Sequence, residues 1–223
     1  MTEILLLRHG KTAGNLEHRY VGCCTDEPLC EEGRRELTGK KMPPIGRLYV
    51  SPMKRCAETA EILWPQHPPL RIIPNLRETD FGDFEYKNYE DLSGNPDYQA
   101  WVDSGGALPF PNGETTEFFR KRCCNAFEQI VDDLCESREE EPRVPPNILR
   151  EDGRAENSVV QTDNAEETAL RAGIVAHGGT IMAILERFGF PKMDYFDYQV
   201  KNGCGYLLTP VEGTDLWNYR YLP

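Results

Sequence analysis

Short apolar runs alternate along the chain with longer stretches in which apolar residues recur at helical spacing. The first run, residues 4–7, is apolar at every position, which predicts a strand buried on both faces of a sheet. Further apolar runs predict strands at 47–50, 70–73, 173–176, 205–209 and 216–221. The stretches between them predict helices at 31–41, 52–64, 114–136 and 181–188. This alternation predicts an α/β fold, a three-layer sandwich with a mostly parallel central sheet.

The longest predicted helix, 114–136, has the clearest buried face. Its apolar positions recur at helical spacing and are expected to face the core: Phe119, Cys123, Phe127, Ile130 and Leu134. From 137 to 172 the chain turns to charges, prolines and small polar residues, which favours a loop insertion over a second domain. The 223 residues are therefore expected to form one domain, 1–223, around one core.

Two of the predicted strand-to-helix junctions carry histidine. Arg8 and His9 follow the first strand, and His177 follows the strand at 173–176. Because the carboxyl ends of parallel strands meet at one edge of the sheet, these side chains are expected to lie close together. A guanidinium binds anions through a planar fork of donors, and an imidazole acts as a nucleophile or an acid/base near neutral pH.

The other features of these junctions also favour an anion. Ser51 and Pro52 predict the N-cap and first position of a helix, and Arg55, about one turn into that helix, is expected to lean back toward the sheet edge. Gly178 and Gly179 follow His177 at a helix start, whose free amides favour anions. The junctions together predict a cradle for phosphate.

The charge of the chain limits its partners. A formal net charge of −12 argues against a nucleic-acid partner or an anionic membrane surface, so a phosphate site must be a local cationic pocket. The chain has no apolar run long enough for a membrane span, and residues 1–4 lack the basic flank of a signal peptide. A cytoplasmic location is therefore predicted.

The eight cysteines do not show metal-ligand spacing. No Cys-x-x-Cys pair occurs, and the pairs Cys23-Cys24 and Cys123-Cys124 are directly adjacent. The thiols are expected to be reduced and without function, and no metal or cofactor is predicted.

Two other motif interpretations fail on spacing. Residues 10–12, Gly-Lys-Thr, resemble the end of a P-loop, but that motif requires glycine where Leu5 stands. Residues 177–179, His-Gly-Gly, resemble an esterase oxyanion loop, but the chain has no Gly-x-Ser-x-Gly nucleophile elbow.

The segment 7–15, Leu-Arg-His-Gly-Lys-Thr-Ala-Gly-Asn, resembles the signature of the histidine phosphatase superfamily, the phosphoglycerate mutase-like proteins. Segments 51–60 and 176–179 are similar to the second and third signatures of that family. Segment 76–85 resembles the stretch that carries its acid, and 113–115 the start of its later helix. The resemblance follows the family's order over nearly the whole chain and implies a phosphoglycerate mutase-like fold.

The resemblance also implies roles for individual residues. His9 would be phosphorylated, Glu78 would be the acid/base, and Arg8, Asn15, Arg55, His177 and the start of the helix at Gly178 would surround the phosphoryl group. Phosphoryl transfer depends mainly on positioning and charge neutralisation, which arginine and histidine supply without metal. Asp80, Asp83 and Glu85 lie close to Glu78 in sequence, so spacing alone does not single out the acid.

Three departures from the family pattern favour a phosphatase over a mutase. Tyr86 stands where the family often has glycine, and Val21 stands where mutases have serine or threonine. Residues 80–112 lack the paired arginines of mutases. The pattern is most similar to α-ribazole phosphatase-type phosphatases that act on a small phosphorylated substrate. A phosphoglycerate mutase and a non-catalytic phosphate-binding member are the alternatives, and oligomeric state is not predicted.

Overall fold

The computed structural model describes residues 2–139 and 171–223, so most of the predicted insertion lies outside the described residues. Within them the chain forms a seven-stranded sheet in the order β3-β2-β4-β1-β6-β7-β5. The strands are β1 (Glu3–Arg8), β2 (Arg47–Val50), β3 (Leu70–Ile72), β4 (Arg171–Ala176), β5 (Gly189–Phe190), β6 (Gly205–Pro210) and β7 (Trp217–Leu222).

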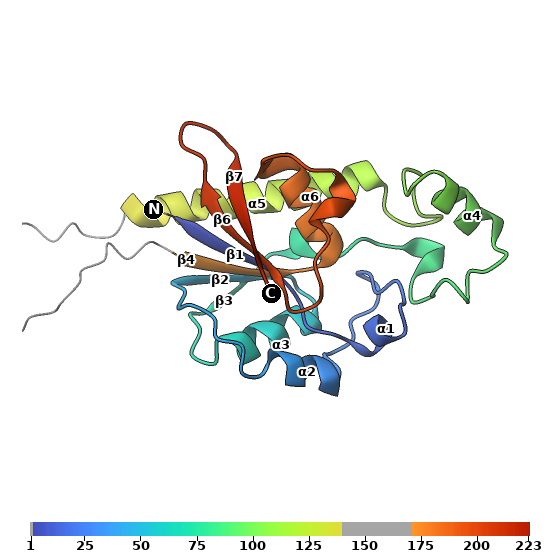
Figure 1. Ribbon diagram of the computed structural model, residues 1–223, viewed down its shortest axis with the longest axis horizontal. Coiled ribbons are helices and arrows are strands. Elements are labelled where there is room, and N and C mark those ends of the chain that lie inside the picture. The colour runs from blue at the N-terminus through green and yellow to red at the C-terminus, as the bar shows by residue number, and fades with distance from the viewer. Residues whose placement is uncertain (1, 140–170) are drawn as a thin grey trace, which may run out of the picture.

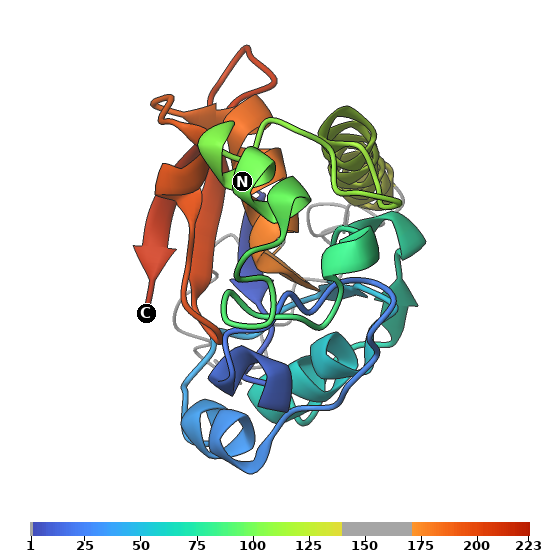
Figure 2. The same cartoon turned by 90° about the vertical axis from the view of Figure 1, so that its right-hand side faces the viewer.

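The sheet is mostly parallel, as predicted. β1 and β2 both pair in parallel with β4, which lies between them, and β3 pairs in parallel with β2. The exception is β6, which runs antiparallel to both β1 and β7. The carboxyl ends of β1, β2 and β4 therefore share one edge of the sheet, which faces the viewer in Figure 2.

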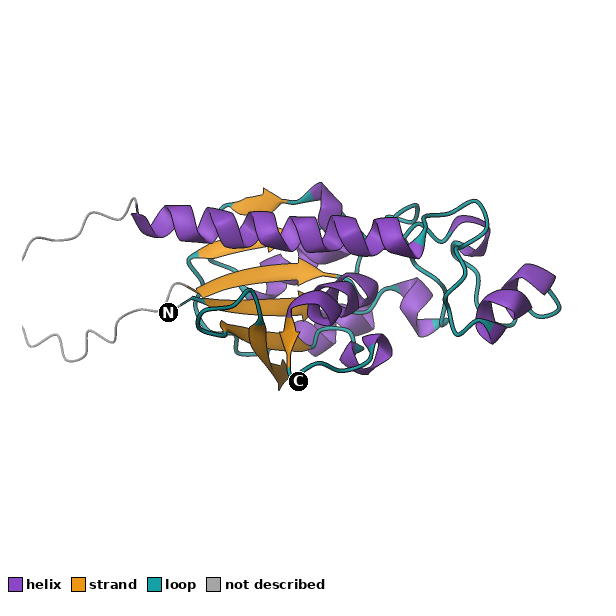
Figure 3. Cartoon of the chain, turned by 90° about the horizontal axis from the view of Figure 1, so that it is seen from above, coloured by secondary structure: helices purple, strands orange, loops and turns teal. Residues whose placement is uncertain are grey.

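Helices cover both faces of the sheet, which confirms the three-layer sandwich. The helices are α1 (Ala13–Leu16), α2 (Glu31–Leu37), α3 (Lys54–Leu63), α4 (Pro96–Asp103), α5 (Thr116–Glu139) and α6 (Gly178–Phe188). Figure 1 shows α5 and α6 above the strands and α2 and α3 below them. Seen from above, α5 lies along the strands, and α4 lies beyond the sheet edge (Figure 3).

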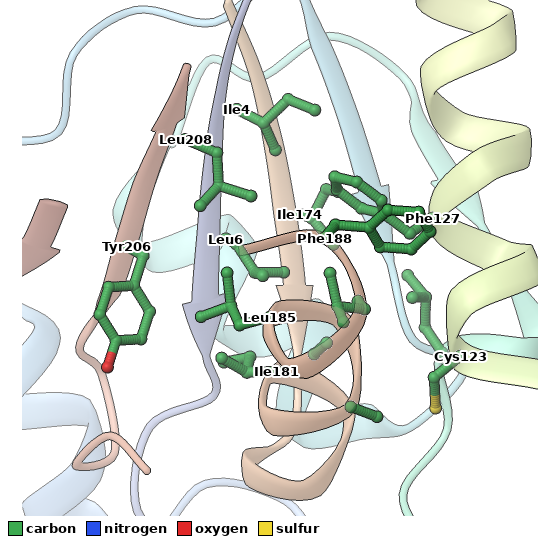
Figure 4. Close-up of a cluster of buried hydrophobic side chains, with 14 of the residues drawn as sticks. Ile4, Leu6, Cys123, Phe127, Ile174, Ile181, Leu185, Phe188, Tyr206 and Leu208 are labelled. Atoms are coloured by element: carbon green, nitrogen blue, oxygen red, sulfur yellow. The ribbon is translucent and has the colours of Figure 1, made fainter. Parts of the chain in front are cut away.

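The apolar run of β1 feeds both cores. Ile4 and Leu6 join the cluster beneath α5 and α6 (Figure 4), whereas Leu5 and Leu7 pack with residues of α2 and α3. All four side chains are at most 1% exposed. Each such burial stabilises the fold by about 1.5–3 kcal/mol, so β1 is held in place from both sides. The predicted core face of α5 is also buried: Phe119, Cys123, Phe127, Ile130 and Leu134.

Several predicted helix ends were wrong. α2 ends at Leu37 rather than at 41, because Thr38 is extended and Gly39 has a φ of +90°, outside the helical region. α6 begins at Gly178, three residues earlier than predicted, with His177 as its N-cap. α5 runs three residues into the segment predicted as insertion, and β4 takes up the last two residues of that segment.

The start of α3 also differs from the prediction. Met53 is the N-cap, without a side-chain cap, so Ser51 and Pro52 lie outside the helix. Arg55 is therefore in the first turn of α3, not one turn into it. None of the helices in 2–139 or 171–223 is long and apolar enough to span a membrane.

Candidate active site

The three strand-to-helix junctions meet at the sheet edge, as predicted. The amide of His9 donates to the Ala176 carbonyl oxygen at 3.0 Å, and the amide of Ser51 donates to the Val175 carbonyl oxygen at 3.0 Å. These bonds continue the β1–β4 and β2–β4 ladders by one residue each. Backbone pairing thus fixes the spacing of the residues that follow the three strands.

His9 presents one ring nitrogen for chemistry. Its Nδ1 lies 2.7 Å from the Gly10 carbonyl oxygen, which can only accept a hydrogen bond, so Nδ1 carries the proton and Nε2 the lone pair. The ring is 3% exposed. Burial, and then the charges of Arg55 and Arg8, hold the pKa of His9 well below its usual range. The imidazole is therefore neutral and nucleophilic at Nε2.

His177 lies beside His9, with the ring centroids 5.1 Å apart. Its Nε2 shares a hydrogen bond of 2.7 Å with Ser51 Oγ, and its Nδ1 has no partner among the described residues. Burial, and then Arg55 and His9, lower the pKa of His177 well below its usual range. Ser51, which was predicted as a helix cap, instead orients His177. In the sequence, this residue is marked by the Ser-Pro pair that opens the second signature.

The two arginines are anchored by backbone carbonyl groups. Arg8 Nη1 donates to the Val200 carbonyl oxygen at 2.8 Å, and Arg55 donates to those of Thr25 at 2.8 Å and Gly22 at 3.0 Å. Within the described residues, neither Arg8 Nε nor Arg55 Nε has a hydrogen-bond partner. Buried donors without a partner are rare in proteins, and the charges of these two arginines act on His9. Arg55 is fully buried behind the site rather than on its surface.

Asn15 is held in one orientation. Its Oδ1 accepts from the amide of Thr12 at 3.2 Å and from Asn202 Nδ2 at 3.0 Å, so the Nδ2 group is its donor toward the cavity. Asn202 also donates to the His9 carbonyl oxygen at 3.1 Å. No pattern in the sequence singles out Asn202, which lies in a turn almost two hundred residues from His9.

A cavity of about 560 Å³ opens at this edge of the sheet. Of the predicted site residues it is lined by Arg8, His9, Asn15, Glu78 and Gly178, while Arg55 and His177 lie beneath it. Asp80, Asp83 and Glu85 are not among the residues that line it. Of the four acids that the sequence left open, Glu78 is thus the one that lines this cavity.

The Glu78 carboxylate is aimed by two backbone amides. Oε1 accepts from Thr79 N at 2.9 Å, and Oε2 accepts from Gly179 N at 3.1 Å, in the first turn of α6. A Cβ on Gly179 would lie 2.5 Å from Glu78 Oε1, so any larger residue there would push the carboxylate out of this position. The carboxylate is 8% exposed and faces the same cavity as His9.

The outer part of the cavity is aromatic. Trp101 of α4 packs against Phe110 at a centroid distance of 5.2 Å, and Tyr20 packs against Phe81 at 5.3 Å. All four side chains line the cavity, together with Phe119, Tyr195 and Phe196. No local pattern predicted this wall: Trp101 lies on a helix that has no buried face, and the other three rings of the two pairs come from loops.

A buried ion pair supports the backbone that carries Glu78. Arg122 Nη2 donates to the Glu78 carbonyl oxygen at 2.9 Å and Nη1 to that of Arg77 at 2.8 Å. The same guanidinium binds the Glu114 carboxylate at 2.6 and 2.7 Å. The two side chains are only 4% and 7% exposed. The pair therefore ties α5 to the segment that bears the acid.

Replacing Arg122 with methionine is expected to lower the free energy of unfolding by about 3–5 kcal/mol, because the Glu114 charge is left buried and unpaired. The matched control is Arg187→Met, which breaks an ion pair with Asp215; the two side chains are 53% and 60% exposed. This substitution is expected to change the free energy of unfolding by less than about 1 kcal/mol. Urea unfolding of both variants measures the difference. Equal losses of unfolding free energy in the two variants would show that burial of the Arg122–Glu114 pair does not determine its contribution to stability.

Comparison with known proteins identifies relatives over most of the chain. A model of the histidine phosphatase superfamily (branch 1) matches residues 4–138. The adenosylcobalamin/α-ribazole phosphatase of Salmonella typhimurium is 34% identical over 52% of this chain and 61% of its own length. Phosphoglycerate mutase-like protein 4 of Arabidopsis thaliana is 30% identical over 58% of this chain and 60% of its own length. The matches thus span about three-fifths of these curated relatives.

The fold has close counterparts among solved structures. The α-ribazole phosphatase of Shigella flexneri superposes with a TM-score of 0.68 at 22% identity, covering 99% of this chain and 96% of that one. This likeness confirms the predicted phosphoglycerate mutase-like fold.

Proposed function

The chain belongs to the histidine phosphatase superfamily, and from that premise we propose that it hydrolyses a small phosphomonoester through a phosphohistidine at His9. One observation carries the proposal. His9, with its Nδ1 proton held by Gly10, faces the same cavity as the buried carboxyl group of Glu78. A binding site for phosphate alone needs neither a free ring nitrogen nor an acid.

In the first step, His9 Nε2 attacks phosphorus as the bond to the leaving oxygen breaks. Protonated Glu78 gives its proton to that oxygen, and the alcohol departs. In the second step, water attacks the phosphohistidine, Glu78 takes a proton from it, and inorganic phosphate leaves with His9 restored. The guanidinium groups of Arg8 and Arg55, whose Nε atoms have no partner among the described residues, offset the charge on the phosphoryl oxygens, and the amide of Gly178 donates to them. Guanidinium groups supply this charge, so we infer a reaction that requires no metal.

The aromatic wall supports a leaving group with a flat apolar part. Trp101, Phe110, Tyr20 and Phe81 supply ring faces and edges beyond the phosphate end of the cavity, where a planar base stacks favourably. An aromatic nucleoside 5′-phosphate fits this arrangement. The relative named as an α-ribazole phosphatase makes α-ribazole 5′-phosphate the substrate we propose first, in the cytoplasm that the sequence predicts.

The test is release of phosphate from a panel containing α-ribazole 5′-phosphate, other nucleoside monophosphates, an aryl phosphate and 3-phosphoglycerate. We expect the aromatic nucleoside phosphates to give the highest kcat/KM, with a rate unchanged by chelator. The mutase alternative is tested by supplying 3-phosphoglycerate with a trace of 2,3-bisphosphoglycerate. Fast formation of 2-phosphoglycerate with little free phosphate would replace the hydrolase with a mutase, and no turnover of any ester would leave a binding module.

A further inference from the structure

The adjacent cysteines that sequence spacing set aside come together with an acid in the folded chain. The Sγ atoms of Cys23 and Cys24 and a carboxylate oxygen of Asp80 all lie within 4.8 Å of one another. Cys24 is exposed, and the other two side chains are half-buried, so solvent reaches the cluster. It lies outside the set of residues that line the active-site cavity.

We propose that Cys23, Cys24 and Asp80 form a binding site for one thiophilic divalent cation, of which Zn²⁺ is the prototype. Two thiolates and a carboxylate are a ligand set that Zn²⁺ accepts, with water in the fourth position of a tetrahedron. Zn–S bonds of about 2.3 Å place tetrahedral ligands about 3.8 Å apart, so the observed separations need only small side-chain rotations.

The backbone holds the two halves of the site in fixed register. The amide of Cys23 donates to the Thr79 carbonyl oxygen at 3.1 Å, and a Cβ on Gly22 would lie 2.4 Å from that same oxygen. Asp80 is oriented from the other side, because its Oδ1 accepts from the amide of Gly82 at 2.9 Å. The loop with the thiols and the loop with the carboxylate are thus locked together before any ion arrives, which reduces the ordering needed on binding.

The site also touches the phosphate pocket indirectly. Arg55 donates to the carbonyl oxygen of Gly22, next to Cys23, and Asp80 lies two residues from Glu78. An ion at this position would bridge the segment anchored by Arg55 and the segment that carries the acid.

The experiment titrates the reduced, chelator-stripped full chain with Zn²⁺ against a chromophoric competitor, and separately with Co²⁺, whose thiolate complexes absorb in the near ultraviolet. We expect one Zn²⁺ per chain and a thiolate-to-cobalt band. Cys23→Ser and Cys24→Ser should each reduce the band, because one thiolate remains, and weaken Zn²⁺ binding by about tenfold or more, since even outer-shell changes commonly cost that much. Asp80→Asn should weaken binding and keep the band.

Cys135→Ser is the matched control, because Cys135 is an exposed thiol outside the cluster, and it should bind Zn²⁺ like the wild type. Melting temperature confirms that each variant is folded. Zinc affinity unchanged in folded Cys24→Ser, or a cobalt complex without a thiolate band, would overturn the site.

Discussion

Replacing His9 with alanine is expected to remove phosphatase turnover by roughly four orders of magnitude or more, the scale on which loss of a covalent nucleophile is felt. The bond of Nδ1 to the Gly10 carbonyl oxygen leaves Nε2 as the nitrogen that faces the cavity, and alanine removes this nucleophile. Steady-state release of phosphate from an aryl phosphate measures the loss.

A trapping experiment tests the intermediate directly. Rapid quenching at alkaline pH, where phosphohistidine survives, should yield labelled phosphate on residue 9 of the wild type and none in His9→Ala. His67→Ala is the matched control, because His67 is not among the residues that line the cavity. Near-normal turnover in His9→Ala, or label on His177 instead, would contradict covalent catalysis at His9.

Glu78→Gln is expected to slow the hydrolysis of phosphate esters with poor leaving groups by about a hundred- to ten-thousandfold, the usual contribution of a general acid. Aryl phosphates should be affected far less, because a phenolate leaves without a proton. Glutamine keeps the size of the side chain, and its carbonyl oxygen can still accept from Gly179 N, although its NH2 group cannot accept from Thr79 N. Comparison of kcat for alkyl and aryl phosphates gives the contrast.

Asp80→Asn is the control for this substitution, measured with chelator present. Asp80 is near Glu78 in sequence but is not among the residues that line the cavity, so its change should leave the alkyl-to-aryl ratio alone. Equal losses on both ester types in Glu78→Gln would move the acid role to another residue, and a loss confined to Asp80→Asn would assign it to Asp80.

Local sequence predicted those parts of the site that follow strands directly. The apolar run before Arg8 is long enough to define β1, and His177 follows an equally clear strand, so both positions at the sheet edge could be predicted. The start of the helix near Ser51 could not be predicted, because a serine before proline is typical of a helix cap whether or not it serves as one. Its hydrogen bond with His177 depends on a residue far along the chain.

The supporting residues depend on contacts that no local pattern encodes. Arg122 looks like an ordinary polar position on an amphipathic helix, and Asn202 like a turn residue, yet each reaches a site segment many residues away. α4 escaped prediction because its eight residues, none of them buried, lack an apolar stripe. The antiparallel direction of β6 is likewise set by tertiary pairing, since the apolar pattern of a strand does not encode the direction in which it pairs.

The position of β4 between β1 and β2 has a consequence for biosynthesis. A ribosome makes β1 and β2 long before residues 171–176, yet neither of these strands pairs with the other, and both pair with β4. A nascent chain that has emerged only as far as the end of α5 therefore has β1 unpaired on both edges, β2 unpaired on one edge, and no His177. The centre of the sheet, and the phosphate pocket with it, can form only after β4 has been made, late in translation.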